Sequence, residues 1–327
     1  MQALAKQPFW RDTRPPSFLS ARWLMAFTTL SSGLSSGDLL ADRRADYAEM
    51  LAESGDWTAA AELMTGALQL APNWAAGWFR AGELREKAGN SAGAEQAWRE
   101  ALRLEPADRL GATLKLALLG ASPIPETPPT DFVEALFDDY ADRFDHALVG
   151  KLGYRVPELL EAAIRATGRT HFDKAVDLGC GTGLMGQRLR PFCGELEGID
   201  LSAEMLRKAE ARGVYDRLIK GDIAELDIPP DIDLVTAADV FMYVGTLEAV
   251  FAKVAAMLQP GGLFAFSVEA SDGDDLVLRE SRRYAHGRAY VEHELAQAGL
   301  SLLSLTEDTI RMDRGEAIRG LVVVAQA

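Results

Sequence analysis

A glycine-rich turn at residues 176–183, which reads VDLGCGTG, constrains this chain more than any other feature. A short apolar strand is expected at 174–178, and a helical pattern follows at 184–189. Glycine is needed where the backbone turns with positive φ and where a ligand approaches main-chain atoms without a Cβ in the way. A strand, a glycine turn and a helix N-terminus together form the nucleotide-binding corner of a doubly wound α/β sheet. The sequence therefore predicts a Rossmann-like α/β domain.

Two classes of nucleotide ligand compete for that corner. Residues 181–186 satisfy the G-x-G-x-x-G pattern of dinucleotide sites, and Asp200 ends a second expected strand at 196–199, where an acidic side chain binds ribose hydroxyls in either class. Asp177 distinguishes the two, because a carboxylate at the entrance of the loop repels a pyrophosphate and suits a cationic ligand without phosphate. We therefore expect S-adenosylmethionine in preference to NAD. A purely structural turn is the weaker alternative, since glycines cost backbone entropy.

These segments resemble a known family. The loop at 177–183, followed by GIDLS at 198–202, is similar to motif I and the acidic ribose-binding motif of class I S-adenosylmethionine-dependent methyltransferases, and the resemblance spans about 131–327. It implies that Met205 lies under the adenine, that Asp222 accepts a hydrogen bond from the adenine amino group and that Ile223 covers the ring. The alternative for Asp222 is that it caps a turn at the end of a strand. The implied cofactor site also includes Asp177, Gly179, Gly181, Gly183, Asp200 and Leu201.

A helix expected to begin at Asp131 contains the run FDDYADRFD at 137–145. This run resembles the helix with which many small-molecule methyltransferases cover the cofactor, which implies that Tyr140 and Phe144 pack near its methionine end. Aromatic faces attract a sulfonium by cation–π interaction. Core packing of an amphipathic helix is the alternative for these side chains. Another helix is expected from 154 to 165.

The residues expected to lie near the methyl acceptor follow a fourth expected strand at 233–237. We call this region the acceptor side. Methyltransferases of exocyclic base nitrogens or of glutamine carry an Asn/Asp-Pro-Pro-aromatic tetrad at this point, whereas this chain has DVFM at 239–242, so methylation of DNA or RNA amino groups is not expected. Polar groups that are candidates for the chemistry here are Asp239, also counted in the cofactor site, Tyr243, Glu269 and His286.

Two of the predictions for the C-terminal part concern single side chains. A helical pattern is expected over 274–298, with a break near Gly287, and it contains His286. We expect His286 to titrate near neutral pH as a catalytic group. The alternative is that it is a solvated histidine at the surface. Arg311 is a candidate for binding an acidic substrate, with the same alternative of a surface role.

The remaining pattern completes the sheet. A helix is expected at 247–258, a buried fifth strand at 263–268, and an antiparallel hairpin at 301–311 and 318–325. The result is a seven-stranded sheet whose last strand is antiparallel, a feature that separates methyltransferases from the dinucleotide Rossmann fold.

The chain before this domain repeats at a spacing of 34 residues, with Gly55 matching Gly89 and Pro72 matching Pro106. Each unit reads as two amphipathic helices, and the period resembles tetratricopeptide repeats. We expect an all-α repeat domain at 38–120, closed by a capping helix at 109–119 and followed by a proline-rich linker at 121–130. Such a module would bind a protein partner or mediate self-association, or it would only brace the enzyme.

Composition narrows the partners and the compartment. The net charge of −15 argues against nucleic acid as a partner, because phosphate contacts need clustered Lys and Arg. The cysteines Cys180 and Cys193 are too few for a disulfide framework, so a cytoplasmic protein is expected, and the scattered histidines predict no metal site. Residues 1–37 are predicted to be a disordered leader, with Met25 as an alternative start. The apolar run at 23–30 is too short to span a membrane, so no membrane contact is expected.

The sequence thus predicts an S-adenosylmethionine-dependent methyltransferase that acts on a small molecule or a protein side chain, with an unidentified methyl acceptor. One alternative is a non-catalytic repeat scaffold in which the cofactor only stabilises the fold. The other is an NAD-dependent reductase.

Overall fold

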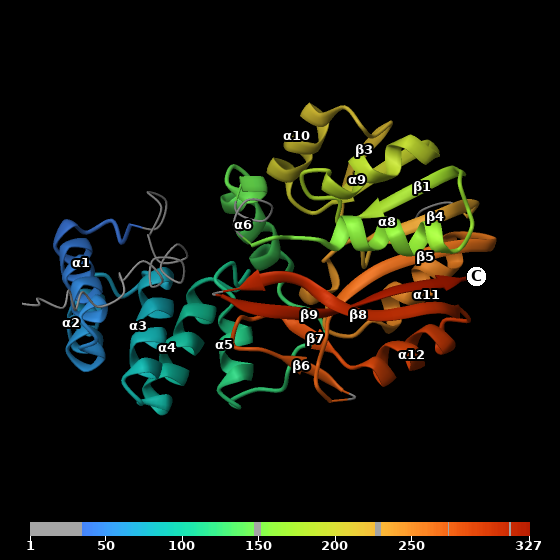
Figure 1. Cartoon of the computed structure of the whole chain (residues 1–327). Coiled ribbons are helices and arrows are strands. Elements are labelled where there is room, and N and C mark those ends of the chain that lie inside the picture. Colours follow the sequence, from blue (N-terminus) through green and yellow to red (C-terminus); the bar gives the residue numbers. More distant parts are fainter. Residues whose placement is uncertain (1–34, 147–151, 226–229, 274, 314) are drawn as a thin grey trace, which may run out of the picture. The chain divides into compact units, whose positions relative to one another are not determined.

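A mixed sheet forms the centre of the C-terminal part of this chain, for which a computed structural model describes residues 35–146, 152–225, 230–273, 275–313 and 315–327. Its strand order is β3-β2-β1-β4-β5-β9-β8 (Figure 1). The predicted leader lies almost entirely outside the described residues. The strands are β1 Phe172–Leu178, β2 Cys193–Asp200, β3 Arg217–Lys220, β4 Ile232–Ala237, β5 Leu258–Glu269, β8 Ser301–Asp313 and β9 Glu316–Gln326.

The direction of the strands confirms the predicted sheet. The first five strands of the chain pair in parallel, whereas β9 runs antiparallel to both β5 and β8. All residues of β4 are buried, as expected for a parallel strand covered on both faces. The seven-stranded arrangement with an antiparallel last strand is therefore present.

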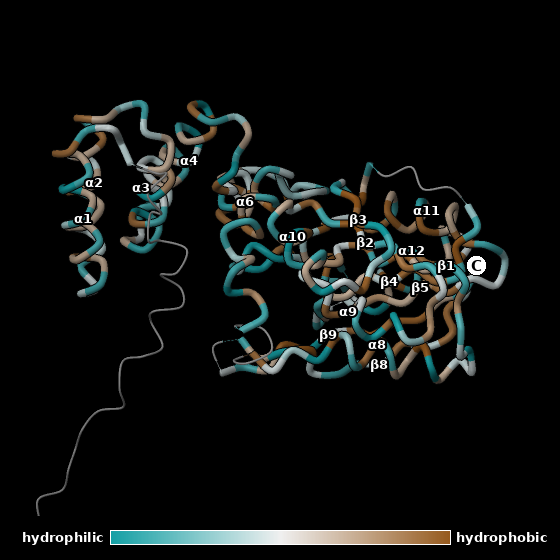
Figure 2. Tube along the Cα trace, turned by 90° about the horizontal axis from the view of Figure 1, so that it is seen from above, coloured by the Kyte–Doolittle hydropathy of each residue, from teal (hydrophilic) through white to brown (hydrophobic). Residues whose placement is uncertain are grey.

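Helices cover both faces of the sheet. The helices of this part are α6 Thr130–Tyr140, α8 Val156–Ala166, α9 Leu184–Leu189, α10 Ala203–Arg212, α11 Glu248–Met257 and α12 Arg288–Gln297, with short 3₁₀ turns η3 Arg190–Phe192 and η4 Phe241–Tyr243. On one face Leu234 and Val322 pack in a core with α8 and α9, and on the other Val235 and Val323 pack with α11 and α12. Neighbouring strand residues thus point to opposite faces. In Figure 2 hydrophobic stretches lie among the strands and the helices that cover them.

The predicted helical pattern over 274–298 is wrong in its first half. The chain there forms an antiparallel strand pair, β6 Leu276–Leu278 and β7 Tyr284–His286, and α12 begins only at Arg288. The charged stretch 279–283 favours helix by composition, but the apolar and aromatic residues on either side pair across a turn in which Arg282 has φ 62°. Tertiary pairing therefore overrides local propensity.

The N-terminal part of the described chain is helical. Its helices are α1 Leu39–Glu53, α2 Trp57–Leu70, α3 Ala75–Lys87, α4 Ser91–Leu104 and α5 Ala112–Leu118. The turns between the paired helices use Gly55 and Gly89, both at positive φ. Asp56 and Asn90, which follow them, accept hydrogen bonds from first-turn amides of α2 and α4.

Close helix packing in this region depends on small residues. The side chain of Trp98 lies where a Cβ on Gly82 would be, at 2.3 Å, and its indole donates a hydrogen bond to the carbonyl of Phe79. The expected capping helix is α5, whose first turn is held by the carboxylate of Asp108. Among the described residues no helix has the length and apolar character that a membrane span requires.

The proline-rich segment at 121–130 contacts the sheet domain directly. The carbonyl of Glu126 accepts a hydrogen bond from the amide of Thr246, and the carbonyl of Pro125 accepts one from the hydroxyl of Tyr284. No helix or strand is present from Leu119 to Pro129, and α6 begins at Thr130.

Candidate cofactor and acceptor site

The glycine loop has the backbone that its sequence predicts. Gly179, Gly181 and Gly183 all have positive φ, at 60°, 53° and 93°, between the end of β1 and the start of α9. A Cβ on Gly179 would lie 2.5 Å from Val240, so that glycine serves close packing. A Cβ on Gly181 would have only Phe144 near it, at 4.0 Å. The backbone at Gly181 is therefore the part of the loop that a ligand can approach.

Asp177 lies beneath the loop and is completely buried. Its carboxylate accepts hydrogen bonds of 2.7 Å from the hydroxyls of Tyr215 and Thr236. Burial raises the pKa of Asp177 to about 6, against the two hydroxyl bonds, which lower it. The sequence did not indicate Tyr215 or Thr236, since neither belongs to a motif. The selection of a cationic ligand by Asp177 stays a prediction.

Asp200 joins the end of β2 to the glycine loop. One carboxylate oxygen accepts a hydrogen bond from the amide of Gly181 at 2.8 Å, and the other accepts one from the amide of Ser202 at 2.9 Å. Burial raises the pKa of Asp200 to about 6, and its backbone hydrogen bonds act in the opposite direction. The carboxylate predicted to bind ribose thus lies next to the loop backbone.

The residues predicted to surround the adenine come from the next two strand ends. Met205, in the first turn of α10, is fully buried, and Leu201 is partly buried. Asp222, after β3, accepts hydrogen bonds from the amide of Ala224 and the hydroxyl of Thr130. Ile223 is partly buried against the core. The structure brings these residues to the same edge of the sheet as the glycine loop, where a ligand of the domain is expected.

The chain around α6 lies over the glycine loop. Asp138 accepts a hydrogen bond from the hydroxyl of Ser202 at 2.5 Å, and Asp145 accepts one from the hydroxyl of Thr182 at 2.6 Å. Asp145 also pairs with Arg212 of α10. These acidic contacts were missed by sequence reasoning, although the acidic residues spaced between the aromatic ones in 137–145 are a signal for them.

Aromatic side chains connect this helix to the acceptor side. The ring of Phe144 lies 5.6 Å from that of Tyr140 and 6.2 Å from that of Phe137, and Phe137 lies 5.0 Å from Tyr243 of η4. The rings meet edge to face, which is a favourable aromatic geometry. Phe144 thus lies beside the loop with Tyr140 against it, and Phe137 connects Phe144 to Tyr243, a candidate for the chemistry.

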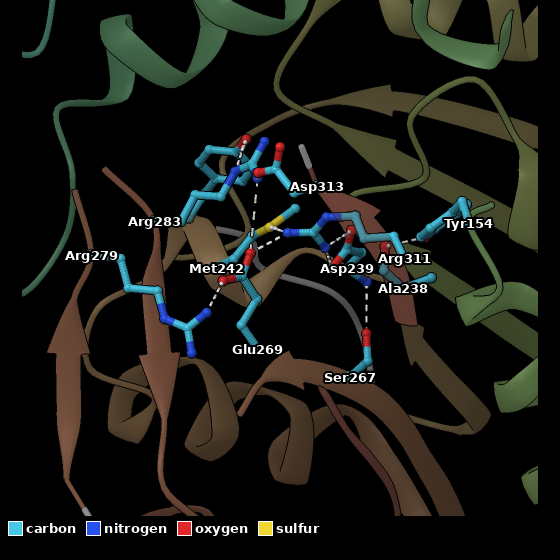
Figure 3. A network of polar contacts seen from close by, with 11 residues as sticks. Tyr154, Ala238, Asp239, Met242, Ser267, Glu269, Arg279, Arg283, Arg311 and Asp313 are labelled. Carbon is cyan, nitrogen blue, oxygen red and sulfur yellow. Dashed lines mark hydrogen bonds and ion pairs between the residues drawn. The ribbon is translucent and has the colours of Figure 1, made fainter. Parts of the chain in front are cut away.

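Asp239 follows β4 in a left-handed conformation with φ 61°. Its amide donates a hydrogen bond to the hydroxyl of Ser267, and its carboxylate oxygens both lie 2.7 Å from Nη1 of Arg311. Arg311 is buried and also pairs with Glu269 at the end of β5 (Figure 3). Both Nη groups of Arg311 thus bind side chains inside the protein, and its predicted role in binding an acidic substrate and the alternative of a surface role are both wrong.

The same network continues toward the surface. Glu269 accepts a hydrogen bond from Arg279 at 3.2 Å and lies 4.0 Å from Nη1 of Arg283, which is itself 3.7 Å from Asp313 (Figure 3). The Nε of Arg283 donates a hydrogen bond of 3.2 Å to the hydroxyl of Tyr243. Tyr154, at the start of the chain entering α8, donates to the carbonyl of Ala238 at 3.4 Å. Neither Arg279 nor Arg283 was singled out from the sequence, because both lie in the stretch mistaken for helix.

His286 is completely buried in β7, and its Nε2 lies 2.9 Å from the carbonyl oxygen of Gly245. Burial lowers the pKa of His286 to about 4. The predictions that it titrates near neutral pH and that it alternatively lies at the solvated surface are therefore both wrong. Among the residues that the structure describes, no His, Cys, Asp and Glu side chains are grouped as metal ligands would be.

Comparison with known proteins identifies part of this chain. Residues 176–266 match the family model described as "Methyltransferase domain". The malonyl-[acyl-carrier protein] O-methyltransferase of Enterobacter lignolyticus is 29% identical over 148 residues, which is 44% of this chain and 57% of that protein. The sterol 24-C-methyltransferase ERG6B of Gibberella zeae is 28% identical over 121 residues, 33% of this chain and 32% of that protein.

The similarity covers part of each relative. A probable protein arginine N-methyltransferase 6 of Arabidopsis thaliana is 27% identical over 173 residues, 49% of this chain and 38% of that protein. The chain thus spans between about a third and just over half of the length of these relatives. Among solved structures, an S-adenosylmethionine-dependent methyltransferase from Clostridium acetobutylicum is 21% identical and covers 58% of this chain and 98% of its own, with a TM-score of 0.45. The matches to the family model and to the curated methyltransferases show that the chain contains a class I S-adenosylmethionine-dependent methyltransferase domain, preceded by a helical region.

Proposed function

We propose that this protein transfers the methyl group of S-adenosylmethionine to a small molecule or a protein side chain. The observation that carries the proposal is the glycine loop at the end of β1, with the carboxylate of Asp200 bound to the amide of Gly181 within the matched methyltransferase segment. The relatives named above methylate oxygen, carbon and nitrogen according to their names, so none of them supplies the acceptor for this chain.

The residues at this edge of the sheet fit the cofactor. The open side of Gly181 leaves room for the amino-acid part, Asp200 offers lone pairs for ribose hydroxyls, and Asp222 is proposed to accept a hydrogen bond from the adenine amino group. Asp239, Tyr140 and Phe144 are proposed to surround the methionine end, and Leu201, Met205 and Ile223 the base. When bound, the cofactor supplies the methyl group of its sulfonium, and the rest of the cofactor leaves as a neutral thioether.

The protein's own task is then to orient the acceptor and to keep its lone pair free. Tyr243 is the proposed catalytic side chain, since the residue is half-buried and its ring ends the aromatic series that starts at the glycine loop. Asp239 is held by Arg311 and is proposed to position the backbone after β4. We assign no proton transfer to His286, because burial keeps it neutral at physiological pH.

The helical region is proposed to be a tetratricopeptide module that binds a protein partner or a second copy of the chain. Its support is the 34-residue spacing together with the helix pairs α1–α2 and α3–α4, each joined by a glycine turn. Two helix pairs form only a shallow groove, so the module would bind its partner through one face of its helices.

Titration calorimetry of the full chain with S-adenosylhomocysteine and with NADH tests the cofactor. We expect the adenosyl ligand to bind and NADH to bind at least about tenfold more weakly, a difference of about 1.4 kcal/mol. Tighter binding of NADH would favour the reductase. A second assay with S-adenosylmethionine labelled in its methyl group, added to cell extract, should give a labelled product. Cofactor binding without any labelled product would favour the non-catalytic scaffold.

A further inference from the structure

We propose that the methyl acceptor carries a carboxylate group and that Arg283 binds it. The proposal rests on the proposed function, since it names the class of acceptor for the same site. The argument starts from the arginines around Glu269, which differ in how many of their donors the protein itself uses.

Arg311 and Arg279 are occupied. Arg311 is 2% exposed and binds Asp239 and Glu269. Arg279 donates to Glu269 through Nη1 and to the carbonyl of Ala270 through Nη2. Arg311 therefore joins the ends of β4 and β5 to β8, Arg279 binds the end of β5, and both Nη groups of each arginine already bind acceptors of the protein.

Arg283 differs from these two. Within the described residues its side chain makes one hydrogen bond, from Nε to Tyr243, and its ion-pair contacts with Asp313 and Glu269, at 3.7 and 4.0 Å, are longer than hydrogen bonds. Its side chain is 26% exposed. A guanidinium has five donors in a planar fork, so the two Nη groups of Arg283 retain donors that can bind a carboxylate.

The position of Arg283 suits an acceptor. Tyr243 contacts Arg283 on one side and Phe137 on the other, and Phe137 leads through Phe144 to the glycine loop. Burial raises the pKa of Tyr140, and the charge of Arg283 opposes that rise. An acceptor held by its carboxylate at Arg283 would rest its apolar part on these rings, on the side that faces the cofactor.

Charge decides between a carboxylate and a phosphate. The chain has a net charge of −15, so an anion is attracted only where a local cation is available. Asp313 and Glu269 lie within 4 Å of the same guanidinium and repel a dianion more strongly than a monoanion. A singly charged carboxylate is therefore favoured over a phosphate monoester.

The test is binding of simple acids to the full chain loaded with S-adenosylhomocysteine and, in parallel, without it. The probes are benzoate for a small acid and N-acetylglutamic acid amide for a protein side chain, each compared with its amide, benzamide or N-acetylglutamine amide, and phenyl phosphate. Ligand-observed NMR detects the millimolar affinities expected of such small probes. At least one acid should bind about tenfold more tightly than its amide and more tightly than phenyl phosphate.

The variants separate the roles of the residues. Arg283→Gln should weaken binding of the acid about tenfold or more, and Arg283→Lys should weaken it less, because it keeps the charge but loses the fork. Arg288→Gln, the same change at an exposed arginine two residues beyond His286, should leave the affinity unchanged. S-adenosylhomocysteine affinity should be the same in all of these proteins, which also shows that they are folded.

Three results would overturn the proposal: equal affinity for acid and amide, tighter binding of phenyl phosphate, or unchanged affinity for the acid in Arg283→Gln. Absence of binding by both acids in the millimolar range counts against it in the same way. Failure of S-adenosylhomocysteine to bind is read in its own titration and refutes the proposed function instead. Preference for benzoate or for the glutamate derivative identifies a small acid or a protein side chain as the source of the carboxylate.

Discussion

Replacing Arg311 with Met should destabilise the methyltransferase domain by several kcal/mol. The guanidinium of Arg311 is 2% exposed and pairs with Asp239, which is 7% exposed, and with Glu269, which is 2% exposed. Glu269 keeps Arg279 when Arg311 is lost, but Asp239 loses the guanidinium that contacts both of its oxygens. Removing one partner of a buried ion pair costs about 3–5 kcal/mol, because the other charge stays buried without compensation.

The control is Arg319→Met on the neighbouring strand β9. Arg319 is 60% exposed and pairs with Glu307 of β8, so it makes the same kind of contact at the surface. Exposed ion pairs contribute about 0–1 kcal/mol. A second variant combines Arg311→Met with Asp239→Asn, since Asn tolerates the positive φ of this position and removes the uncompensated charge. The double variant should be more stable than Arg311→Met alone by at least about 1 kcal/mol.

The measurement must report on the sheet. The tryptophans of the described residues all lie in the helical region, at Trp57, Trp74, Trp78 and Trp98, so their fluorescence does not follow the network. Urea unfolding monitored by amide hydrogen exchange of peptides from β5 and β8 gives the local free energy of unfolding. If Arg311→Met lowers the free energy of unfolding no more than Arg319→Met does, then removing Arg311 does not leave a buried charge without compensation.

Three further predictions test the cofactor side. Asp200→Ala should weaken S-adenosylhomocysteine binding about tenfold or more in calorimetry, and unchanged affinity would place the ribose elsewhere. The raised pKa of Asp177, about 6 against an ordinary 3.8, means that the folded state binds more protons than the unfolded state between these values, so this group's contribution to stability falls as pH rises from about 4 to 6. Asp177→Asn should therefore lose less stability over that window than the natural chain in urea unfolding, and an identical slope would contradict it. Gly186→Ala places a Cβ 2.3 Å from the ring of Tyr215 and should cost about 1–3 kcal/mol, whereas Gly273→Ala, with Ser271 at 3.9 Å, should be nearly neutral in thermal unfolding.

The sequence predicted the parts of this molecule in which a local pattern and the tertiary structure agree. The glycines at 179, 181 and 183 signal a backbone that only they adopt easily, and all three have positive φ. The helix at 184–189 has the bounds that the sequence predicts, and a 3₁₀ turn follows it. The seven strands and the antiparallel last strand were predicted, whereas the order of the strands in the sheet was not, because periodicity alone does not fix topology.

The parts that could not be predicted depend on partners far away in the chain. Arg311 and Asp239 are 72 residues apart, and nothing in either local sequence shows that they meet. His286 looked polar and accessible because its neighbours in sequence are charged, yet the pairing of β7 with β6 and the carbonyl of Gly245 bury it. A charged stretch was assigned to a helix for the same reason, since composition describes a segment and not what packs against it.

The β6–β7 pair connects the two halves of the chain through adjacent residues. Arg282 donates a hydrogen bond to the carbonyl of Leu110 just before α5, and its guanidinium lies over the ring of Phe132 in α6. Arg283, the next residue, reaches Tyr243 at the acceptor side. The turn between β6 and β7 thus contacts the helical region through one arginine and Tyr243 through the next. The left-handed conformation of Arg282 is unfavourable for a residue with a Cβ and is compensated by its contacts, so we expect the position of Arg283 to depend on the helical region.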